Sequence, residues 1–292
     1  MTAMKKHIIY PMIALALCAC SPAGKDNGED IDTSGYTVFS VDIENLSLGG
    51  AVQGGVWEEG ASIGVFGSEQ GDNEQYFLRR DASGLQAATF YGSVVKGKVS
   101  AYSPFAQGTV SHDGTLPCEL NPVQEFDAAS GKEEWFLRYN PRTFASADSE
   151  GTLHFRYPMG LMSVRFEFQE EIEIKSFTLN CSRGISGRLD VNANGEVSAS
   201  ELSHKFISLD LGDAGVSNKT KDGFTEFLFA LPPGVYQSGE LRLNVITGED
   251  EMEVVLGETE IRRVEGAELP VTAISVETSD LPGFEKEHGY LE

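Results

Sequence analysis

Short segments of alternating apolar and polar residues recur along most of this chain, and this period-two pattern constrains its fold more than any other feature. The segments are rich in aromatic and β-branched residues, which is typical of half-buried β-strands. No stretch of about 12 residues combines a helical period with caps at both ends. Short strands without intervening helices predict an all-β protein built from antiparallel β-sandwiches. The predicted strands cover residues 36–43, 61–67, 98–105, 162–168, 173–180, 224–231, 241–248, 251–257 and 271–278.

Turn signals separate these strands, among them Asn194-Gly195 and Asp222-Gly223. The segment 140–151 is small, polar and poor in strand formers, and it divides the strands into two nearly equal sets. We therefore predict a domain boundary near residue 150, with an N-terminal β-sandwich at 36–150 and a C-terminal β-sandwich at 151–292.

The N-terminus has the order of parts found in a secretory signal. Lys5 and Lys6 precede an apolar run at residues 8–17, which is shorter than the about 20 residues that a membrane-spanning helix needs. The run ends in Leu17-Cys18-Ala19-Cys20, which resembles the lipobox of bacterial lipoproteins, where a small residue precedes the lipidated cysteine. We predict a signal peptide at residues 1–19 and lipid attachment, including palmitate, at Cys20. Acyl chains there would anchor the mature chain to the outer membrane. The alternative is an ordinary cleaved signal whose cysteines are incidental.

The chain is strongly acidic, with a formal net charge of -23 at pH 7. Nucleic acids and anionic lipids carry charge of the same sign, so neither is expected as a partner. Residues 20–35 are polar and aperiodic, which predicts a flexible tether after the lipidated cysteine. Acidic residues at this position resemble the surface-export signal of Bacteroidetes lipoproteins. We therefore expect display on the cell surface, with an anchor that faces the periplasm as the alternative.

Residues 190–201, with the sequence DVNANGEVSASE, match the pattern of a calcium-binding loop. Asp190, Asn192 and Asn194 occupy ligand positions and Glu201 is the twelfth residue. Such a loop needs a helix on each side, whereas the residues before it are broken by glycine and strand-like. Asn194-Gly195 also suits a two-residue hairpin turn. We predict a β-hairpin here and no metal site.

Other catalytic and metal-binding patterns are missing from the sequence. Cys118 and Cys181 are the only cysteines after the leader, and one lies in each predicted domain, so separate thiols are expected rather than a disulfide. The histidines stand far apart without HExxH or HxH spacing, and no GxSxG motif or phosphate-binding glycine loop occurs. We expect a protein that is not an enzyme and holds no cofactor.

Exposed aromatic rings would offer a carbohydrate-binding alternative. Trp57, Trp135, Tyr76 and Tyr102 are the rings considered, and the two tryptophans are the candidate glycan-stacking residues. Trp57 stands just ahead of a predicted strand, where a core position is the commoner role.

Several segments, taken in order, resemble the Bacteroidetes fimbrillin-like lipoproteins, the family of type V pili. VWEEGASIGVFG, QYFLRRD, ATFYG and KVSAYSPF resemble the N-terminal domain of that family, LHFRYPMGLMSVRFEF the start of its second domain, and FLFALPPGVY its late leucine-proline turn. The resemblance covers about residues 36–278. It implies two transthyretin-like β-sandwich domains and a role in cell adhesion as a fimbrial subunit, anchor or accessory protein. It also implies a location at the outer membrane or in the fimbrium.

Pilins of this family are matured by an arginine-specific protease that removes the first strand, and another subunit then donates a strand into the vacated groove. Here no arginine precedes Arg79, so residues 36–43 cannot be released by a cut just after them. Arg79 and Arg80 are the candidate cleavage residues. This departure favours an uncleaved anchor, accessory subunit or stand-alone surface lipoprotein over a polymerising pilin. The alternative function is a glycan-binding outer-membrane lipoprotein of a nutrient-uptake system.

Overall fold

The structure of the 292-residue chain is a computed structural model. It describes residues 35–43, 46–48, 51–53, 57–79, 83–85, 87–111, 115–140, 143–147, 151–192, 194–248, 250–264 and 269–277. All of these residues belong to one compact unit that runs from Thr33 to Glu292.

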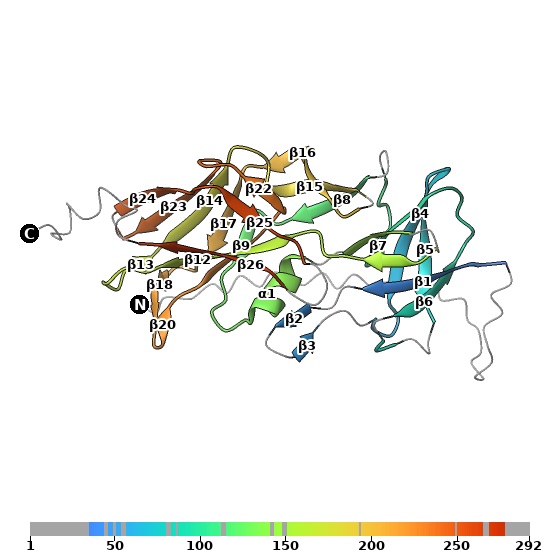
Figure 1. The fold of residues 1–292 in the computed structure, drawn as a ribbon, viewed down its shortest axis with the longest axis horizontal. Coiled ribbons are helices and arrows are strands. Elements are labelled where there is room, and N and C mark those ends of the chain that lie inside the picture. The colour runs from blue at the N-terminus through green and yellow to red at the C-terminus, as the bar shows by residue number, and fades with distance from the viewer. Residues whose placement is uncertain are drawn as a thin grey trace, which may run out of the picture. The chain divides into compact units, whose positions relative to one another are not determined.

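The N-terminal half forms a seven-stranded sheet that closes on itself. Its strand order is β10-β7-β4-β5-β6-β1-β11 (Figure 1). Bridges pair Phe144 with Arg156 and Ala147 with Leu153, so the first and last strands of this order are also joined. The described strands of this sheet therefore form a closed ring, in which no strand is an edge strand. The strands are β1 (Thr37–Ile43), β4 (Ser62–Gly67), β5 (Gln70–Leu78), β6 (Ala88–Gly92), β7 (Val99–Ser103), β10 (Thr143–Ser146) and β11 (Leu153–Phe155).

The inward-facing side chains of these strands form one of the two hydrophobic cores of the described chain. Trp57 lies at the centre of that core, with its ring 4.8 Å from Phe90 and 5.3 Å from Phe155, both in edge-on contact. Phe39 and Val41 of β1 point into the same core. Edge-on aromatic pairs at these distances add to the stabilisation that comes from burial. The first strand is thus a component of the core and not an appendage.

The C-terminal half is built from smaller sheets. A five-stranded sheet has the order β24-β23-β14-β17-β9, and two three-stranded sheets have the orders β21-β12-β26 and β16-β15-β8. Most pairs are antiparallel; β1 with β11, β12 with β26 and β17 with β9 are parallel. The strands are β8 (Thr115–Leu120), β9 (Val123–Glu125), β12 (Gly160–Phe166), β14 (Ser176–Cys181), β15 (Ser186–Asn192), β16 (Val197–His204), β17 (Phe206–Asp210), β21 (Phe227–Leu231), β23 (Leu241–Thr247), β24 (Asp250–Val255) and β26 (Val271–Val276).

Four two-stranded ribbons and one helix complete the described part of the chain. The ribbons pair β2 (Leu46–Leu48) with β3 (Ala51–Gln53), β13 (Glu173–Ile174) with β18 (Val216–Ser217), β19 (Lys219–Thr220) with β20 (Gly223–Phe224), and β22 (Gly234–Tyr236) with β25 (Thr259–Ile261). The helix α1 (Lys132–Tyr139) follows β9.

The second hydrophobic core lies between these sheets and is rich in phenylalanine. Phe177 is in edge-on contact with Phe166, Phe227 and Phe229, at ring distances of 5.2, 5.3 and 5.0 Å. Trp135 and Phe136 of α1 belong to the same core. These residues come from β12, β14 and β21 and from the helix, so one cluster holds separate sheets together.

The all-β fold is confirmed, and every segment predicted as a strand contains one. Two details differ from expectation. Segment 140–151 was expected to be poor in strands, yet β10 lies within it because Thr143–Ser146 pairs with β7. The eight residues of α1 were missed because the helix is shorter than the sequence criterion required.

The predicted domain boundary near residue 150 stays a prediction. Strand pairing crosses that position in both directions. β8 and β9 precede it but pair with β15 and β17, whereas β11 follows it and pairs with β1. The two cores are separate clusters, but the chain passes between them more than once.

Candidate functional site

Both candidate glycan-stacking tryptophans lie in the cores. Trp57 is 3% exposed and Trp135 is 2% exposed, and Tyr76 and Tyr102 are fully buried. A pyranose can stack only on a ring whose face is open, so none of these four rings offers a sugar-binding platform. Their burial follows the commoner role of large aromatic residues in sandwich cores.

The other predicted site residues have different outcomes. Cys20 and Arg80 lie outside the described residues. Arg79 directly follows β5, is half-buried, and donates its backbone N–H to the carbonyl oxygen of Thr89 at 2.9 Å. This bond continues the pairing of β5 with β6, so the first candidate cleavage residue is held beside a paired strand.

The calcium-like motif forms the predicted hairpin between β15 and β16. Val191 pairs with Val197, and the Asn192 Oδ1 accepts hydrogen bonds from the backbone N–H groups of Asn194 and Glu196 at 2.9 and 3.0 Å. Gly195 has a φ of +76°, a conformation that favours glycine. The backbone N–H of Asn192 donates to the carbonyl oxygen of Glu196, which closes the loop at these two residues. It is therefore one residue longer than the predicted two-residue turn.

The cysteines and histidines of the described residues do not form a reactive site. Cys118 and Cys181 are buried and are not joined in a disulfide. His154 on β11 places Nδ1 2.8 Å from both carboxylate oxygens of Asp42, its register partner on β1. Among the described residues, no group of three or more His, Cys, Asp and Glu side chains could hold a metal ion. No helix in the described part of the chain is long and apolar enough to cross a membrane.

The first strand occupies the position that matters for strand exchange. β1 pairs with β6 from Thr37 to Val41 and with β11 from Val41 to Ile43, so every residue of the strand has a partner on at least one side. Phe39 is 7% exposed and Val41 is 2% exposed. Removal of β1 would break both pairings and open the core around Trp57. Such a groove would be apolar and would have unpaired backbone groups along its edges, which is costly in water.

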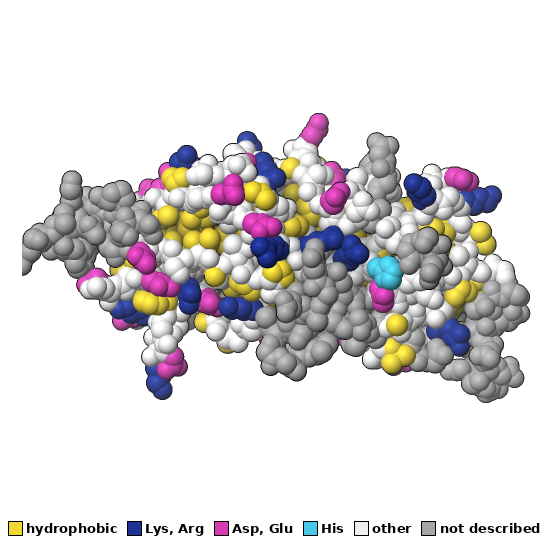
Figure 2. Space-filling view, viewed as in Figure 1, with side chains coloured by type: hydrophobic (Ala, Val, Ile, Leu, Met, Phe, Trp, Pro, Cys, Tyr) yellow, Lys and Arg dark blue, Asp and Glu magenta, His cyan; other side chains and the backbone are white. Residues whose placement is uncertain are grey.

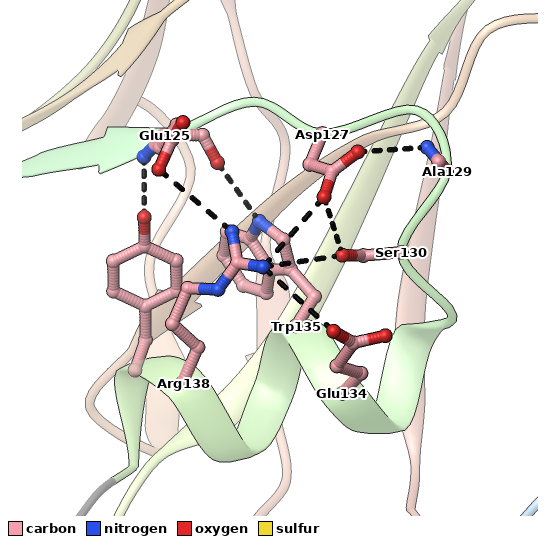
Figure 3. Close-up of polar contacts among 8 residues, drawn as sticks. Glu125, Asp127, Ala129, Ser130, Glu134, Trp135 and Arg138 are labelled. Atoms are coloured by element: carbon pink, nitrogen blue, oxygen red, sulfur yellow. Dashed lines mark hydrogen bonds and ion pairs between the residues drawn. The ribbon is translucent and has the colours of Figure 1, made fainter.

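The edge of the five-stranded sheet at β9 is covered by side chains from α1 (Figure 3). The Trp135 indole N–H donates to the carbonyl oxygen of Glu125 at 3.2 Å, and the Tyr139 hydroxyl accepts the Glu125 backbone N–H. The two side chains thus supply the hydrogen bonds that a neighbouring strand would make. Covering an edge in this way prevents another chain from adding a strand there.

Arg138 holds the same helix to the loop that precedes it (Figure 3). Its guanidinium lies 3.3 Å from Ser130 Oγ and 3.6 Å from an Asp127 carboxylate oxygen, with Glu125 and Glu134 oxygens at 3.9 Å. Hydrogen bonds from the Ser130 hydroxyl and the Ala129 backbone N–H lower the pKa of Asp127. This exposed network orients α1 against the loop before it.

The side chain of Gln124 connects β9 to the neighbouring strand β21. It is fully buried, donates to Ala230 O at 2.9 Å and accepts from Ala230 N–H at 3.0 Å. The carboxamide therefore bonds to β21 as a peptide group would, and it links the five-stranded sheet to the sheet of β21. Buried backbone groups need such partners.

Other edges carry features that oppose strand addition. β16 bulges at residues 200–202, because the register jumps from Gly187 opposite Ser203 to Leu189 opposite Ala199. β24 has the sequence DEMEVV, which places three carboxylates on an edge strand. Bulges and charges are common protections of sheet edges.

A row of exposed rings lies on the outer face of β5, β6 and β1. Tyr36 is 52% exposed, Val38 is 44% exposed and Phe77 is 37% exposed. Tyr91 pairs with Val38 and Phe77 across the strands, and its ring lies 5.9 Å from Tyr36 and 6.3 Å from Phe77. We call the three rings of Tyr36, Phe77 and Tyr91, together with the neighbouring Val38, the aromatic row. Sequence reasoning missed it as a site, although the alternation of residues 36–44 puts Tyr36 and Val38 opposite the core face.

A pocket of about 360 Å³ adjoins the aromatic row. Its lining combines a cation, a carboxylate and hydroxyl groups with small apolar side chains. The register puts Ser40 opposite Thr89 and Arg79 beside Thr89, one step along the strands from the aromatic row. The lining residues are Ser40, Val41, Asp42, Arg79, Leu85, Ala87, Ala88, Thr89 and Thr152.

Charged side chains of both signs are interspersed on the face drawn in Figure 2, where Asp and Glu lie beside Lys and Arg. This face shows no continuous basic area, and the net charge of the chain is -23.

Comparisons with known proteins gave structural similarities only. No family model matches the chain, and no curated protein matches its sequence. A candidate cell adhesion protein from Bacteroides ovatus is 14% identical, with a TM-score of 0.49 over 84% of this chain and 94% of that chain. A candidate cell adhesion protein from Bacteroides uniformis is 9% identical, with a TM-score of 0.46 over 85% and 96%. The tip fimbrial protein Mfa3 from Porphyromonas gingivalis, with C-terminal truncation, is 12% identical, with a TM-score of 0.38 over 75% and 82%.

Proposed function

We propose that the chain is a surface-anchored, fimbrillin-like adhesion lipoprotein that keeps its first strand and serves as an anchor, accessory subunit or stand-alone adhesin. The position of β1 carries this proposal. A strand that is paired on both sides and contributes Phe39 and Val41 to the core is part of the finished fold. A subunit that polymerises by strand exchange must instead present an open groove.

The edges of the described sheets support the same function. Trp135 and Tyr139 cover β9, a bulge interrupts β16, and carboxylates line β24. These features oppose the addition of a strand from another chain at those three edges, as suits a single exposed body on a membrane anchor. Other fimbrial subunits could contact it through side-chain surfaces.

The anchor and the location belong to this proposal and rest on the sequence. Cys20 follows Ala19 at the end of a short apolar run, and the polar residues after it give a tether. We place the mature chain in the outer membrane with its body exposed at the cell surface. The proposed function needs no catalysis.

The anchor is tested with two matched variants of the full chain in cells. Cys20→Ser should move the protein from the membrane fraction to the soluble fraction, and Cys18→Ser should leave it membrane-bound, because only Cys20 has a small residue before it. A deletion strain should adhere less to a host or bacterial surface. The wild-type gene should restore adherence and Cys20→Ser should not. Equal release by both variants, or full adherence of the deletion strain, would contradict the proposal.

A further inference from the structure

The outer face of β5, β6 and β1 carries two adjoining kinds of side chain. The aromatic row comes first along the strands, and the pocket follows at the next outward positions. All three strands lie inside the closed sheet, with a bonded neighbour on each side. A peptide therefore cannot add to this face as an extra strand, and any ligand must bind to side chains.

We infer that this face binds a neutral pyranose saccharide, with a sugar ring stacked on the aromatic row and the next sugar in the pocket. The C–H bonds on one face of a pyranose carry partial positive charge, and they suit the negative face of an aromatic ring. Phe77 and Tyr91 offer adjacent rings on neighbouring strands. This inference rests on the proposed adhesion function and names its ligand class.

The pocket chemistry matches sugar hydroxyl groups, which both donate and accept hydrogen bonds. Arg79 can only donate, the Asp42 carboxylate can only accept, and the hydroxyl groups of Ser40, Thr89 and Thr152 can do either. A volume of about 360 Å³ lies at the lower end of the range for small-molecule pockets. One sugar unit in the pocket and one on the rings would use both parts of the face.

The charges of the site favour a neutral saccharide over an acidic one. Among the described lining residues, Arg79 supplies one cation and Asp42 one anion, and His154 lies against Asp42 on the side of β11. A uronate or sialate would gain the attraction of Arg79 but would meet Asp42 in the same pocket. It would also approach a chain with a net charge of -23.

The test starts with the full lipidated chain, purified in detergent and applied to an array of neutral and acidic oligosaccharides. The best neutral oligosaccharide is then titrated by calorimetry into the wild-type protein and its variants. Phe77→Ala and Tyr91→Ala should each weaken binding about tenfold. Tyr91→Phe keeps the ring and should bind as the wild type does. Thr89→Val preserves the shape of the side chain and should weaken binding through the lost hydroxyl group.

Phe206→Ala is the matched control, because Phe206 is exposed to 38%, as Phe77 is to 37%, but lies on β17. Its affinity should equal that of the wild type. Binding of acidic saccharides alone, no saccharide binding, or equal losses in Phe77→Ala and Phe206→Ala would each overturn the inference. If no saccharide binds but adherence still depends on Cys20, the inference fails and the proposed function stands. If adherence is also independent of the gene, both fail.

Discussion

Gln124 shows how a single buried side chain determines whether two sheets are joined. Its carboxamide bonds to both backbone groups of Ala230, a residue 106 positions further along the chain. No other type of side chain can both donate and accept with this planar geometry, except asparagine, which is shorter by one methylene. From the middle of β9, the residue therefore supplies the hydrogen bonds that a strand beside β21 would make.

Gln124→Leu should lower the free energy of unfolding by about 1–3 kcal/mol, because Ala230 N–H and O would both lose their partner in the protein interior. Chemical denaturation of the purified protein measures this change. Gln237→Ala is the control, since Gln237 is exposed, and its effect should be close to zero. Equal stability of Gln124→Leu and the wild type would show that the carboxamide does not support the junction.

The role of Gln124 could not be predicted from the sequence. β9 has only three residues, too few for a period-two pattern, and its partner is remote. By contrast, the alternation of residues 36–43 puts Phe39 and Val41 on one face of the strand, and both are buried. Trp57 and Trp135 were considered as surface rings because composition alone does not reveal which aromatic residues become buried.

The helix α1 shows how one short element protects a sheet edge. It has eight residues, and its N-cap Gly131 makes no side-chain cap bond, so its intrinsic helical stability is low. Burial of Trp135 and Phe136 in the second core holds it in place. From that position Trp135 and Tyr139 reach the backbone of Glu125 on β9.

The double variant Trp135→Phe and Tyr139→Phe should expose the β9 edge while retaining most of the buried ring area. Each lost hydrogen bond should lower the free energy of unfolding by about 1 kcal/mol, because Glu125 N–H and O would need water in their place. We also expect slow, concentration-dependent association, measured by light scattering. Tyr36→Phe is the control, because Tyr36 is 52% exposed. A double variant as monomeric and as stable as the wild type would contradict the edge-protection role.

At this scale the sequence predicted strands much better than their partners. Residues 190–201 folded into the predicted hairpin because Asn192 and Gly195 act locally. The pairing of β8 with β15 and of β9 with β17 depends on distant contacts and had no signal in the sequence. The helix escaped detection because its stability comes from the core around it and not from its own pattern.

For the molecule as a whole, the presence or absence of β1 in the N-terminal sheet distinguishes a finished subunit from one that needs a strand from another subunit. With β1 in place, the sheet surrounds its core and offers its outer face to ligands. Without β1, the same sheet would open a groove beside Trp57 and Phe90 and would need a strand from another subunit. The absence of an arginine before Arg79 means that a cut just after β1 is not available to an arginine-specific protease.

Whether the first strand stays in the fold can be tested on purified protein from which the signal and tether have been removed. It is treated with an arginine-specific protease, then examined by light scattering after size-exclusion chromatography, by SDS gel without boiling, and by N-terminal sequencing. We expect a monomer before and after treatment and no ladder of SDS-resistant polymers, because β1 remains paired with β6 and β11. A ladder whose subunits begin at Arg80 or Asp81 would contradict it and identify a polymerising pilin.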